Sequence, residues 1–409
     1  MSHDAPVPAP RAGGGPLLSP WTHVTRVAAA LAAGMGVGRF VYTPILPLMH
    51  TQAGLSTGAG AHLATANYAG YLVGALAGTL LPALVRSRAV LRGSFVLLVG
   101  TLAAMPATHS TAVWIALRLL AGVASALIFV VAVSSLLGRL RDHPAHMPGW
   151  GFGGVGAGIA LSGLLVLAVR SAADWQVAWW SSAALAAVLA TAAWKLSPEA
   201  VPAPSAGAPD AVVDPWFGAL FASYTLEGVG YIVAGTFLVA AIGQSAPGWI
   251  GGGAWVLVGL AAVPSSAVWA RLGRRRSRPG LLCAALVIQA VGIALPALVG
   301  GVAAALVSAV LFGATFIGVS TLALAAGAEL RFPRSVALLT AGYSVGQILG
   351  PLAVAPLLHD GYRPALLLAA AVVLAAAVAA AVLRLGFPRR RPMAVRQSAP
   401  AREVRSTGR

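Results

Sequence analysis

The chain has 409 residues, of which 58% are hydrophobic and only 9% are charged, and its mean hydropathy is +0.85. Soluble domains carry about 25% charged residues, so this composition indicates an integral membrane protein. Lys195 is the only lysine and stands outside any G-x-x-x-x-G-K-[ST] sequence, which excludes a P-loop ATPase. The single cysteine, Cys283, excludes an internal disulfide.

Residues 1–23 open the chain with a stretch rich in proline, alanine and glycine. They lack the basic and apolar regions of a signal peptide, so we expect a disordered cytoplasmic tail. A membrane-spanning helix needs about 20 mostly apolar residues, and twelve later segments meet this requirement. Their approximate limits are 24–49, 60–85, 90–107, 111–137, 148–169, 175–196, 215–241, 249–270, 279–299, 301–327, 335–358 and 362–385.

A polar, proline-rich linker divides the twelve segments into two groups of six. It covers residues 197–214, SPEAVPAPSAGAPDAVVD, and its last residue, Asp214, is a helix-start signal before a proline. We therefore expect an all-α membrane protein with two six-helix halves and a basic cytoplasmic tail. The halves lie at 24–196 and 215–385, and the tail lies at 386–409.

The basic residues predict the orientation in the membrane. They lie mostly in the loops after even-numbered segments and in the C-terminal tail, whereas only Arg170 and Arg363 lie in loops after odd-numbered segments. The positive-inside rule then puts both termini in the cytoplasm, and we expect a bacterial inner-membrane protein. The net charge of +17 is explained by this topology, so we expect membrane lipid and not nucleic acid as a partner.

The two groups of segments show a weak internal repeat. GMGVGRFV at 34–41 matches LEGVGYIV at 226–233, and both contain G-V-G. LVGALAGTLLPALVRSR in the second segment aligns with LVGLAAVPSSAVWARLG in the eighth. Two parallel six-helix repeats joined by a cytoplasmic linker are typical of one common transporter architecture.

These residues support a resemblance to a known family. Over about 24–385 the chain resembles the major facilitator superfamily. Within it, GMGVGRFVYTPILPLM followed by ATANYAGYLVGALAG resembles the YbfB/YjiJ group of bacterial transporters. RLLAG at 118–122 is similar to a pattern that the superfamily associates with proton coupling. The resemblance implies a major facilitator fold in which spans one, four, seven and ten line a central cavity.

Three ionisable residues lie well inside the expected spans: Arg39 in the first, Arg118 in the fourth and Glu227 in the seventh. An arginine at the centre of a bilayer costs at least about 2.5–3.5 kcal/mol on insertion scales, so each needs a partner. The repeat aligns Arg39 with Tyr231, one helical turn from Glu227, which predicts a pair between Arg39 and Glu227. Such a pair either shifts when substrate or a proton binds, or is purely structural.

Two arginines against one glutamate leave the interior net positive, which favours a substrate with an anionic group. Arg118 has no carboxylate partner that the sequence identifies. The alternative roles for it are snorkelling toward the membrane surface or hydrogen bonds to backbone carbonyl oxygens. Further polar side chains are candidates for substrate or coupling contacts, and hydrogen bonding within the bundle is the alternative for each. They are Asn67, Tyr71, Tyr231, Gln289, Tyr343 and Gln347.

Glycines recur at four-residue spacing in several segments, which lets helix backbones approach closely. The predicted packing positions are Gly70, Gly74 and Gly78 in the second segment and Gly346 and Gly350 in the eleventh. Such smooth faces would also allow two halves to rock. GFGGVG at 151–156 fits the pattern G-x-G-x-x-G, but it lies in an apolar helix, which disfavours a dinucleotide site.

The sequence favours a secondary active transporter that moves a small organic solute by alternating access, with proton coupling through Glu227. No histidine falls in the middle of a span and no nucleophile–base arrangement stands out, so we expect no enzymatic activity, cofactor or metal. We expect a monomer. The alternatives left open are a broad-specificity drug efflux transporter, a transporter-like sensor and a lipid-handling protein.

Overall fold

The structure is a computed structural model. It describes residues 19–141, 143–144, 146–170, 174–198, 216–246, 248–330, 332 and 335–387. Most of the expected tail at 1–23, most of the linker at 197–214 and nearly all of the tail at 386–409 lie outside the described residues.

Every regular element within the described ranges is a helix, with no β-strand among them. The elements before the linker are α1 (Pro20–Leu31), η1 (Ala32–Val37), α2 (Tyr42–Gln52), α3 (Thr57–Leu80), α4 (Pro82–Val85), α5 (Arg88–Ala104), η2 (Met105–Ala107), α6 (Thr111–Arg139), α7 (His146–Val169) and α8 (Trp175–Ala193). Those after it are α9 (Phe217–Ser245), α10 (Gly248–Leu272), α11 (Arg278–Leu298), α12 (Gly301–Glu329), α13 (Ser335–Val354), η3 (Ala355–Asp360) and α14 (Tyr362–Gly386).

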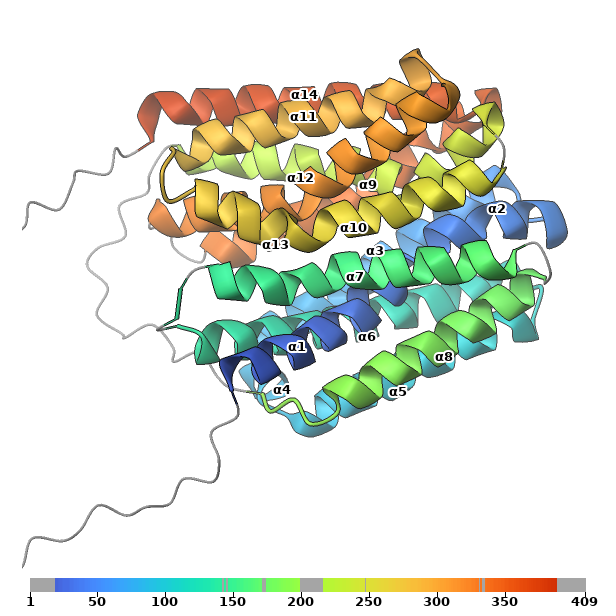
Figure 1. The fold of residues 1–409 in the computed structure, drawn as a ribbon, viewed down its shortest axis with the longest axis horizontal. Coiled ribbons are helices and arrows are strands. Elements are labelled where there is room, and N and C mark those ends of the chain that lie inside the picture. Colours follow the sequence, from blue (N-terminus) through green and yellow to red (C-terminus); the bar gives the residue numbers. More distant parts are fainter. Residues whose placement is uncertain are drawn as a thin grey trace, which may run out of the picture.

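The long helices lie side by side along the longest axis of the molecule (Figure 1). Among the described residues, 11 helical segments are long and apolar enough to cross a membrane. The second expected span corresponds to α3, which is not one of these segments although it has 24 residues. The reason is its polarity, since His62, Thr65 and Asn67 lie within it. The expected number of exactly twelve spans therefore stays a prediction.

A proline sets one helix boundary that differs from the expected span. The expected span at 60–85 is two helices, because α3 ends at Leu80 and α4 starts at Pro82. Leu81 between them has φ −117° and ψ 78°, which is outside the α region that a following proline disfavours. The start of α3 is defined by Ser56, whose Oγ accepts a hydrogen bond from the Ala59 backbone N–H at 3.1 Å.

The first expected span, at 24–49, is not one continuous α-helix. It consists of α1, the π-helix η1, a turn at residues 38–41 and α2. The glycines of this segment have no side chains, so its backbone can lie directly against that of α7. A Cβ added to Gly36 would lie 2.4 Å from the Cα of Gly158, so the two backbones are in direct contact. This break places the side chain of Arg39 in the turn.

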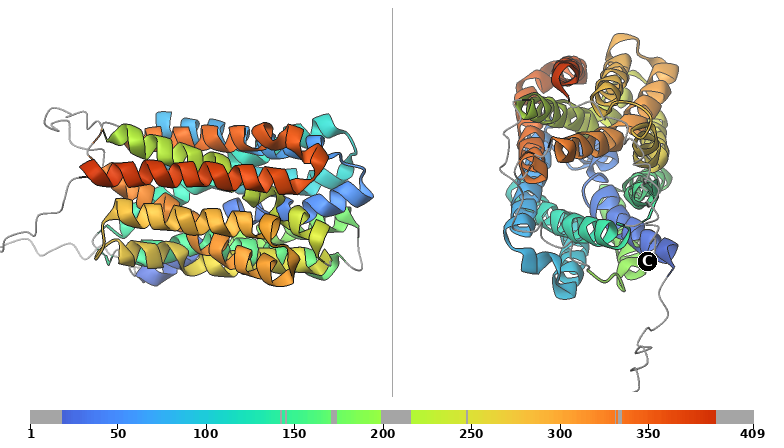
Figure 2. Two further views of the ribbon diagram at one scale, coloured as in Figure 1. Left: turned by 90° about the horizontal axis from the view of Figure 1, so that it is seen from above. Right: turned by 90° about the vertical axis from the view of Figure 1, so that its left-hand side faces the viewer.

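The helices fall into two groups in the view along the bundle, with α1–α8 on one side and α9–α14 on the other (Figure 2). In the first group α3 packs on α6, α1 on α7, and α5 on both α6 and α8. In the second, α9 packs on α13 and α14, and α12 on α10 and α11. The main contacts between the groups join α7 to α10, α3 to α13 and α2 to α9.

The predicted packing glycines of the second segment lie against α6. A Cβ added to Gly70 would lie 1.9 Å from the Leu119 carbonyl oxygen, and one added to Gly74 would lie 2.6 Å from the Val123 carbonyl oxygen. Gly78 faces the side chain of Val130. This stripe therefore joins two helices of the same group.

The predicted glycines of the eleventh segment lie against α9 in the same way. A Cβ added to Gly346 would lie 2.4 Å from the Thr225 carbonyl oxygen, and one added to Gly350 would lie 2.5 Å from that of Val229. Neither predicted stripe lies between the two groups, so the idea that they allow the groups to rock is not supported.

A different set of glycines lies between the groups, where α7 meets α10. A Cβ added to Gly156 would lie 2.5 Å from the backbone nitrogen of Val263, and one added to Gly259 would lie 2.3 Å from that of Ala160. Gly156 belongs to the GFGGVG stretch, so these glycines serve close helix packing.

One end of the bundle is basic. We call it the basic end, and it is the end at which α1 begins and α14 ends (Figure 1). The described basic residues in turns and helix ends there include Arg86, Arg88, Arg92, Arg139, Arg141, Lys195, Arg271, Arg274, Arg275, Arg276, Arg278 and Arg384. At the opposite end, where α2 ends and α14 begins, the described residues include Arg170 and Arg363.

Candidate substrate and coupling site

Arg39 lies in the broken first segment with its side chain in the protein interior, and only 2% of it is exposed. Its Nη2 donates a hydrogen bond of 2.6 Å to the amide oxygen of Gln347 on α13. Its guanidinium carbon lies 4.4 Å from the ring centre of Tyr71 and 4.8 Å from that of Tyr68, both on α3. Aromatic faces attract a cation at such distances, so these rings offset part of its desolvation.

Arg118 has a different role, because it binds the backbone of the first segment. Its Nη1 donates to the Gly38 carbonyl oxygen at 3.3 Å, and its Nη2 donates to the Arg39 carbonyl oxygen at 3.2 Å. Among the described residues no backbone N–H donates to either oxygen, since the helix is interrupted there. The rings of Tyr42 and Trp179 lie beside the Arg118 guanidinium. Arg118 therefore satisfies carbonyl groups that the helix break leaves without partners.

Asn67 ties α3 to the same region through a backbone contact. Its side-chain nitrogen donates to the Arg118 carbonyl oxygen at 2.9 Å, and the residue is fully buried. The adjacent Gly122 allows this approach, since an added Cβ would lie 2.0 Å from the Asn67 carbonyl oxygen. Among the described residues, the Asn67 side chain thus hydrogen-bonds the helix backbone and makes no hydrogen bond to the side chains of Arg39 or Arg118.

A polar chain runs from Arg39 across α13 to α9. The Gln347 amide oxygen accepts from Arg39, and its nitrogen donates to the Tyr231 hydroxyl at 2.6 Å. Three of the candidate residues, Arg39, Gln347 and Tyr231, are therefore joined by two consecutive hydrogen bonds. The chain links the first segment of one helix group with two helices of the other.

Glu227 is fully buried on α9, one turn before Tyr231. Its Oε1 accepts from the Gln289 amide nitrogen at 3.3 Å, while Oε2 has no hydrogen-bond partner in the part of the chain that the structure describes. The predicted pair between Arg39 and Glu227 is not formed, because within the described ranges Glu227 makes no ion pair. Arg39 is held by Gln347 and the tyrosine rings instead, and Tyr231 lies within electrostatic range of both charges.

Five nearly parallel rings form a stack, which we call the aromatic ladder: Tyr224, Tyr343, Tyr231, Phe316 and Phe312. Successive ring centres are 4.4, 5.4, 6.0 and 5.6 Å apart, and the interplanar angles lie between 9° and 16°. The rings come from α9, α12 and α13. Such distances are those of attractive offset stacking.

A second set of rings comes from the other helix group, and we call it the aromatic wall: Tyr71, Phe129 and Phe152. The ring centres of Tyr71 and Phe129 are 6.2 Å apart, and those of Phe129 and Phe152 are 6.4 Å apart. Tyr71 is within electrostatic range of Tyr224 on the ladder. Among the described residues no ring contact joins the wall to Tyr224 or Tyr343.

The interior is closed toward the end opposite the basic end. Residues 30–46 and 230–240 are buried without interruption, and the Thr43 hydroxyl donates to the Gly235 carbonyl oxygen between them. The Tyr68 hydroxyl bonds Thr236 at 2.7 Å, and nearer this end Tyr362 and His50 lie 3.2 Å apart. Toward the basic end the same central helices alternate between buried and partly exposed positions.

All of the predicted polar residues lie in this region, and their contact with substrate stays a prediction. The region also contains residues that the sequence did not single out. Tyr68, Tyr224 and Phe316 are the main ones. Tyr224 could have been found from its spacing, because Tyr224, Glu227 and Tyr231 lie on one face of a helix at intervals of three and four residues. Five of the seven tyrosines in the chain lie around Arg39 and Glu227.

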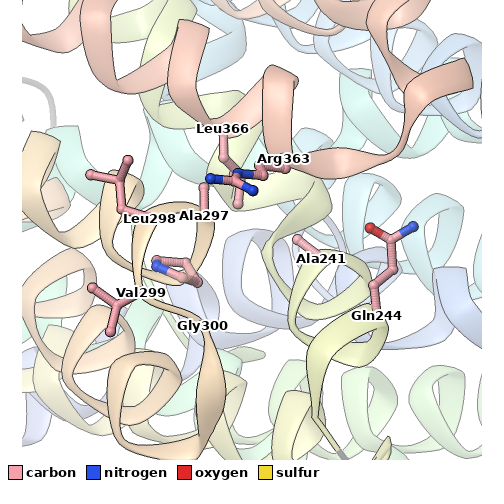
Figure 3. A pocket seen from close by; sticks show the side chains of 9 residues that line it. Ala241, Gln244, Ala297, Leu298, Val299, Gly300, Arg363 and Leu366 are labelled. Carbon is pink, nitrogen blue, oxygen red and sulfur yellow. The ribbon is translucent and has the colours of Figure 1, made fainter.

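A pocket of about 240 Å³ lies elsewhere, among α9, α11 and the start of α14. Figure 3 shows Arg363 above Ala297, with Gln244 on the neighbouring helix. Gln244 is occupied in the fold, since its side-chain oxygen accepts from the Tyr362 backbone N–H at 3.3 Å. None of the predicted site residues lines this pocket.

Comparison with family models matches residues 31–381 to a family described as "Uncharacterised MFS-type transporter YbfB". Comparison with curated proteins finds no significant match. The family match covers most of the chain, including the break in the first segment and the residues around Arg39, Arg118 and Glu227. The chain therefore belongs to this family of major facilitator transporters.

Proposed function

We propose that this major facilitator transporter is a secondary active transporter that moves a small organic solute with an anionic group, coupled to protons, by alternating access. In this proposal twelve helices span a bacterial inner membrane as two six-helix halves, and α3 is the second span. Both termini lie in the cytoplasm. The chain works as a monomer without cofactor or metal and performs no enzymatic reaction.

The observation that carries the proposal is that Arg39 is buried without a neutralising charge in the described chain. This buried cation has no carboxylate partner among the described residues, and its Nε has no hydrogen-bond partner there either. Holding a guanidinium inside a membrane is costly, so such arginines serve function in most membrane proteins. An anionic group on a substrate would supply the missing charge.

Glu227 supports the coupling part of the proposal. Burying an ionised carboxylate without a cation costs several kcal/mol, and taking up a proton removes that charge. Glu227 lies one turn from Tyr231, which is linked through Gln347 to Arg39. Protonation at Glu227 and anion binding at Arg39 are therefore coupled through a short series of contacts in this proposal.

The burial pattern supports alternating access. Closure by Thr43, Tyr68 and Tyr362 at one end, with partly exposed positions toward the basic end, is what one of two alternating states requires. Under the positive-inside rule the basic end is cytoplasmic, so this state faces the cytoplasm.

Efflux of cationic drugs is a second candidate function, because one observation favours it. The Glu227 carboxyl lies within electrostatic range of Tyr224, Tyr231 and Tyr343. A carboxylate beside aromatic rings is also a suitable site for an organic cation. The sign of the bound ligand therefore separates the two candidates.

The test begins with thermal-shift measurements on the purified full chain with small carboxylates, organic phosphates and quaternary ammonium compounds. Compounds that stabilise the chain are then tested for uptake into proteoliposomes with and without an imposed pH gradient. We expect anions to stabilise it and to accumulate only when the gradient is present. Stabilisation by cations alone would favour drug efflux, and accumulation independent of the gradient would contradict proton coupling.

A further inference from the structure

Beside Arg39, the interior of this protein contains two groups of aromatic rings, the aromatic ladder and the aromatic wall. We propose that the substrate is a planar aromatic carboxylate, with its carboxylate on Arg39 and its ring between the aromatic wall and Tyr343 of the aromatic ladder. This inference rests on the proposed function and specifies the substrate class of the same site.

The hydrogen bonding of Arg39 is suited to a carboxylate. Nε and Nη2 form one edge of a guanidinium and point two parallel N–H groups in one direction. In this protein a single amide oxygen of Gln347 occupies Nη2, and the buried Nε has no partner in the described chain. A carboxylate that displaced the Gln347 oxygen would accept from both atoms, which is the strongest arrangement for this pair of groups. The Gln347 side chain would keep its other hydrogen bond, to Tyr231.

Tyr343 lies where the rest of such a ligand would go. It precedes Gln347 by four residues on α13, so the two side chains are on the same face, about 6 Å apart along the axis. A carboxylate and the six-membered ring attached to it span a similar length. Tyr343 is also partly exposed, in contrast to Tyr224 and Tyr231 of the ladder, which are buried.

The aromatic wall supplies the facing surface. Tyr71 contacts the Arg39 guanidinium, and Phe129 and Phe152 continue from it toward the basic end. Phe129 and Phe152 are partly exposed as well. Both faces of the Tyr343 ring are covered, by Tyr224 and Tyr231, so Tyr343 offers a ligand the edge of its ring. A planar ring that enters from the basic end therefore meets the aromatic wall on one side and the edge of Tyr343 on the other before its carboxylate reaches Arg39.

The partial exposure of Phe152 is toward the interior. Gly151 before it packs against Leu136 of α6, and Gly153 after it packs against the Val263 backbone of α10. Successive helical residues are 100° apart, so Phe152 points between α6 and α10. The outer face of α7 carries other residues, such as the exposed Trp150.

The experiment measures binding to the purified full chain by isothermal titration calorimetry with three probes. Benzoate has both the ring and the charge, cyclohexanecarboxylate has the charge without the π-system, and benzamide has the ring without the charge. We expect benzoate to bind at least about tenfold more tightly than either of the others, a difference of about 1.4 kcal/mol. Equal binding of cyclohexanecarboxylate, or absence of benzoate binding to folded protein, would overturn the inference.

Variants assign the contacts. Tyr343→Leu should weaken benzoate binding about tenfold and leave cyclohexanecarboxylate binding nearly unchanged, whereas Tyr343→Phe should retain benzoate binding. Arg39→Lys keeps the charge but loses the two-pronged edge, so it should weaken both carboxylates. Trp180→Leu, on a side chain that is 53% exposed, is the matched control for losing a ring and should bind benzoate normally. Unchanged benzoate preference in Tyr343→Leu would contradict the proposed position of the ring.

The outcomes separate this inference from the proposed function. Proton-driven uptake of aliphatic anions, without a preference for aromatic ones, would overturn the substrate class and leave the transport proposal intact. Tight benzoate binding without any uptake above that of protein-free liposomes would overturn the transport proposal and leave the binding site intact.

Discussion

The guanidinium of Arg118 and the backbone of Arg39 are in contact inside the protein. Nη2 of Arg118 lies 3.2 Å from the Arg39 carbonyl oxygen, and Nη1 lies 3.3 Å from the oxygen of the preceding residue, Gly38. A charged side chain thereby replaces the backbone donors that a continuous helix would provide. The position of the Arg39 side chain depends on this contact, because it fixes the turn from which that side chain extends.

Replacing Arg118 with glutamine should loosen the turn at residues 38–41. Loss of two charge-assisted hydrogen bonds leaves buried carbonyl groups without donors, so we expect destabilisation of about 1–3 kcal/mol. The measurements are thermal unfolding in detergent and hydrogen–deuterium exchange of the turn. The control is Arg170→Gln, at a half-buried arginine just beyond α7. Unchanged unfolding and exchange in Arg118→Gln would show that the turn holds its shape without this arginine.

The sequence predicted the helical segments and the buried ionisable residues well, because both depend on local hydropathy. It also predicted close packing at Gly70 and Gly346, since small residues at fixed spacing are a local pattern. The first and last residues of each span were less predictable. The break at Leu81 was missed because the hydropathy pattern does not take account of the conformational effect of the following proline.

The partner of Arg39 could not be predicted from local hydropathy or residue spacing. Aligning the two repeats places Tyr231 opposite Arg39 along the axis, but it does not say in which direction a long side chain points. In the structure the side chain extends to Gln347 and the α3 tyrosines. The aromatic ladder could not be predicted either, because its rings come from three helices, and the sequence does not show which faces of α9, α12 and α13 meet.

Gly70→Ala should destabilise the protein although it adds only one methyl group. The new Cβ would lie 1.9 Å from the Leu119 backbone oxygen, so α3 and α6 must separate. We expect a loss of about 1–3 kcal/mol, as for other overpacked interiors. Gly100→Ala is the matched control, because nothing lies within 4 Å of its added Cβ. Equal melting temperatures of the two variants would contradict the close approach of these helices.

The orientation predicts the result of reporter fusions. A green fluorescent protein placed within residues 199–214 or after residue 390 should fluoresce, because these sites are expected in the cytoplasm. A fusion at Gly54, in the turn between α2 and α3, should be dark after export. Alkaline phosphatase fusions should give the reverse pattern. Fluorescence at Gly54 together with none after residue 390 would reverse the orientation.

Closure of the end opposite the basic end should protect Tyr362. Its ring is 6% exposed, and its hydroxyl lies 3.2 Å from Nε2 of His50. In a Cys283→Ser background, Tyr362→Cys should react slowly with a membrane-impermeant maleimide, while Thr51→Cys, at an exposed position, should react fast. Adding His50→Ala should accelerate labelling of Tyr362→Cys several-fold. Labelling as fast as at Thr51→Cys without that change would contradict closure.

Glu227→Gln should abolish proton coupling without abolishing the movement of substrate across the membrane. Glutamine has nearly the same shape and can still bond Gln289, but it cannot take up or release a proton. We expect this variant to lose accumulation driven by a pH gradient and to keep exchange of substrate for substrate, since exchange needs no net protonation. Both are measured in the same proteoliposomes with a solute that stabilises the wild-type chain.

The double variant Arg39→Ala/Glu227→Gln distinguishes this role from that of an ion pair. If the two residues only neutralised each other, removing both charges would restore transport. Because Arg39 bonds Gln347 and not Glu227, we expect the double variant to stay inactive in both assays and to bind the solute weakly. Recovery of transport in the double variant would demonstrate a structural pair that forms in another state. Full gradient-driven accumulation by Glu227→Gln alone would refute coupling through this carboxyl, because no proton would then pass through residue 227.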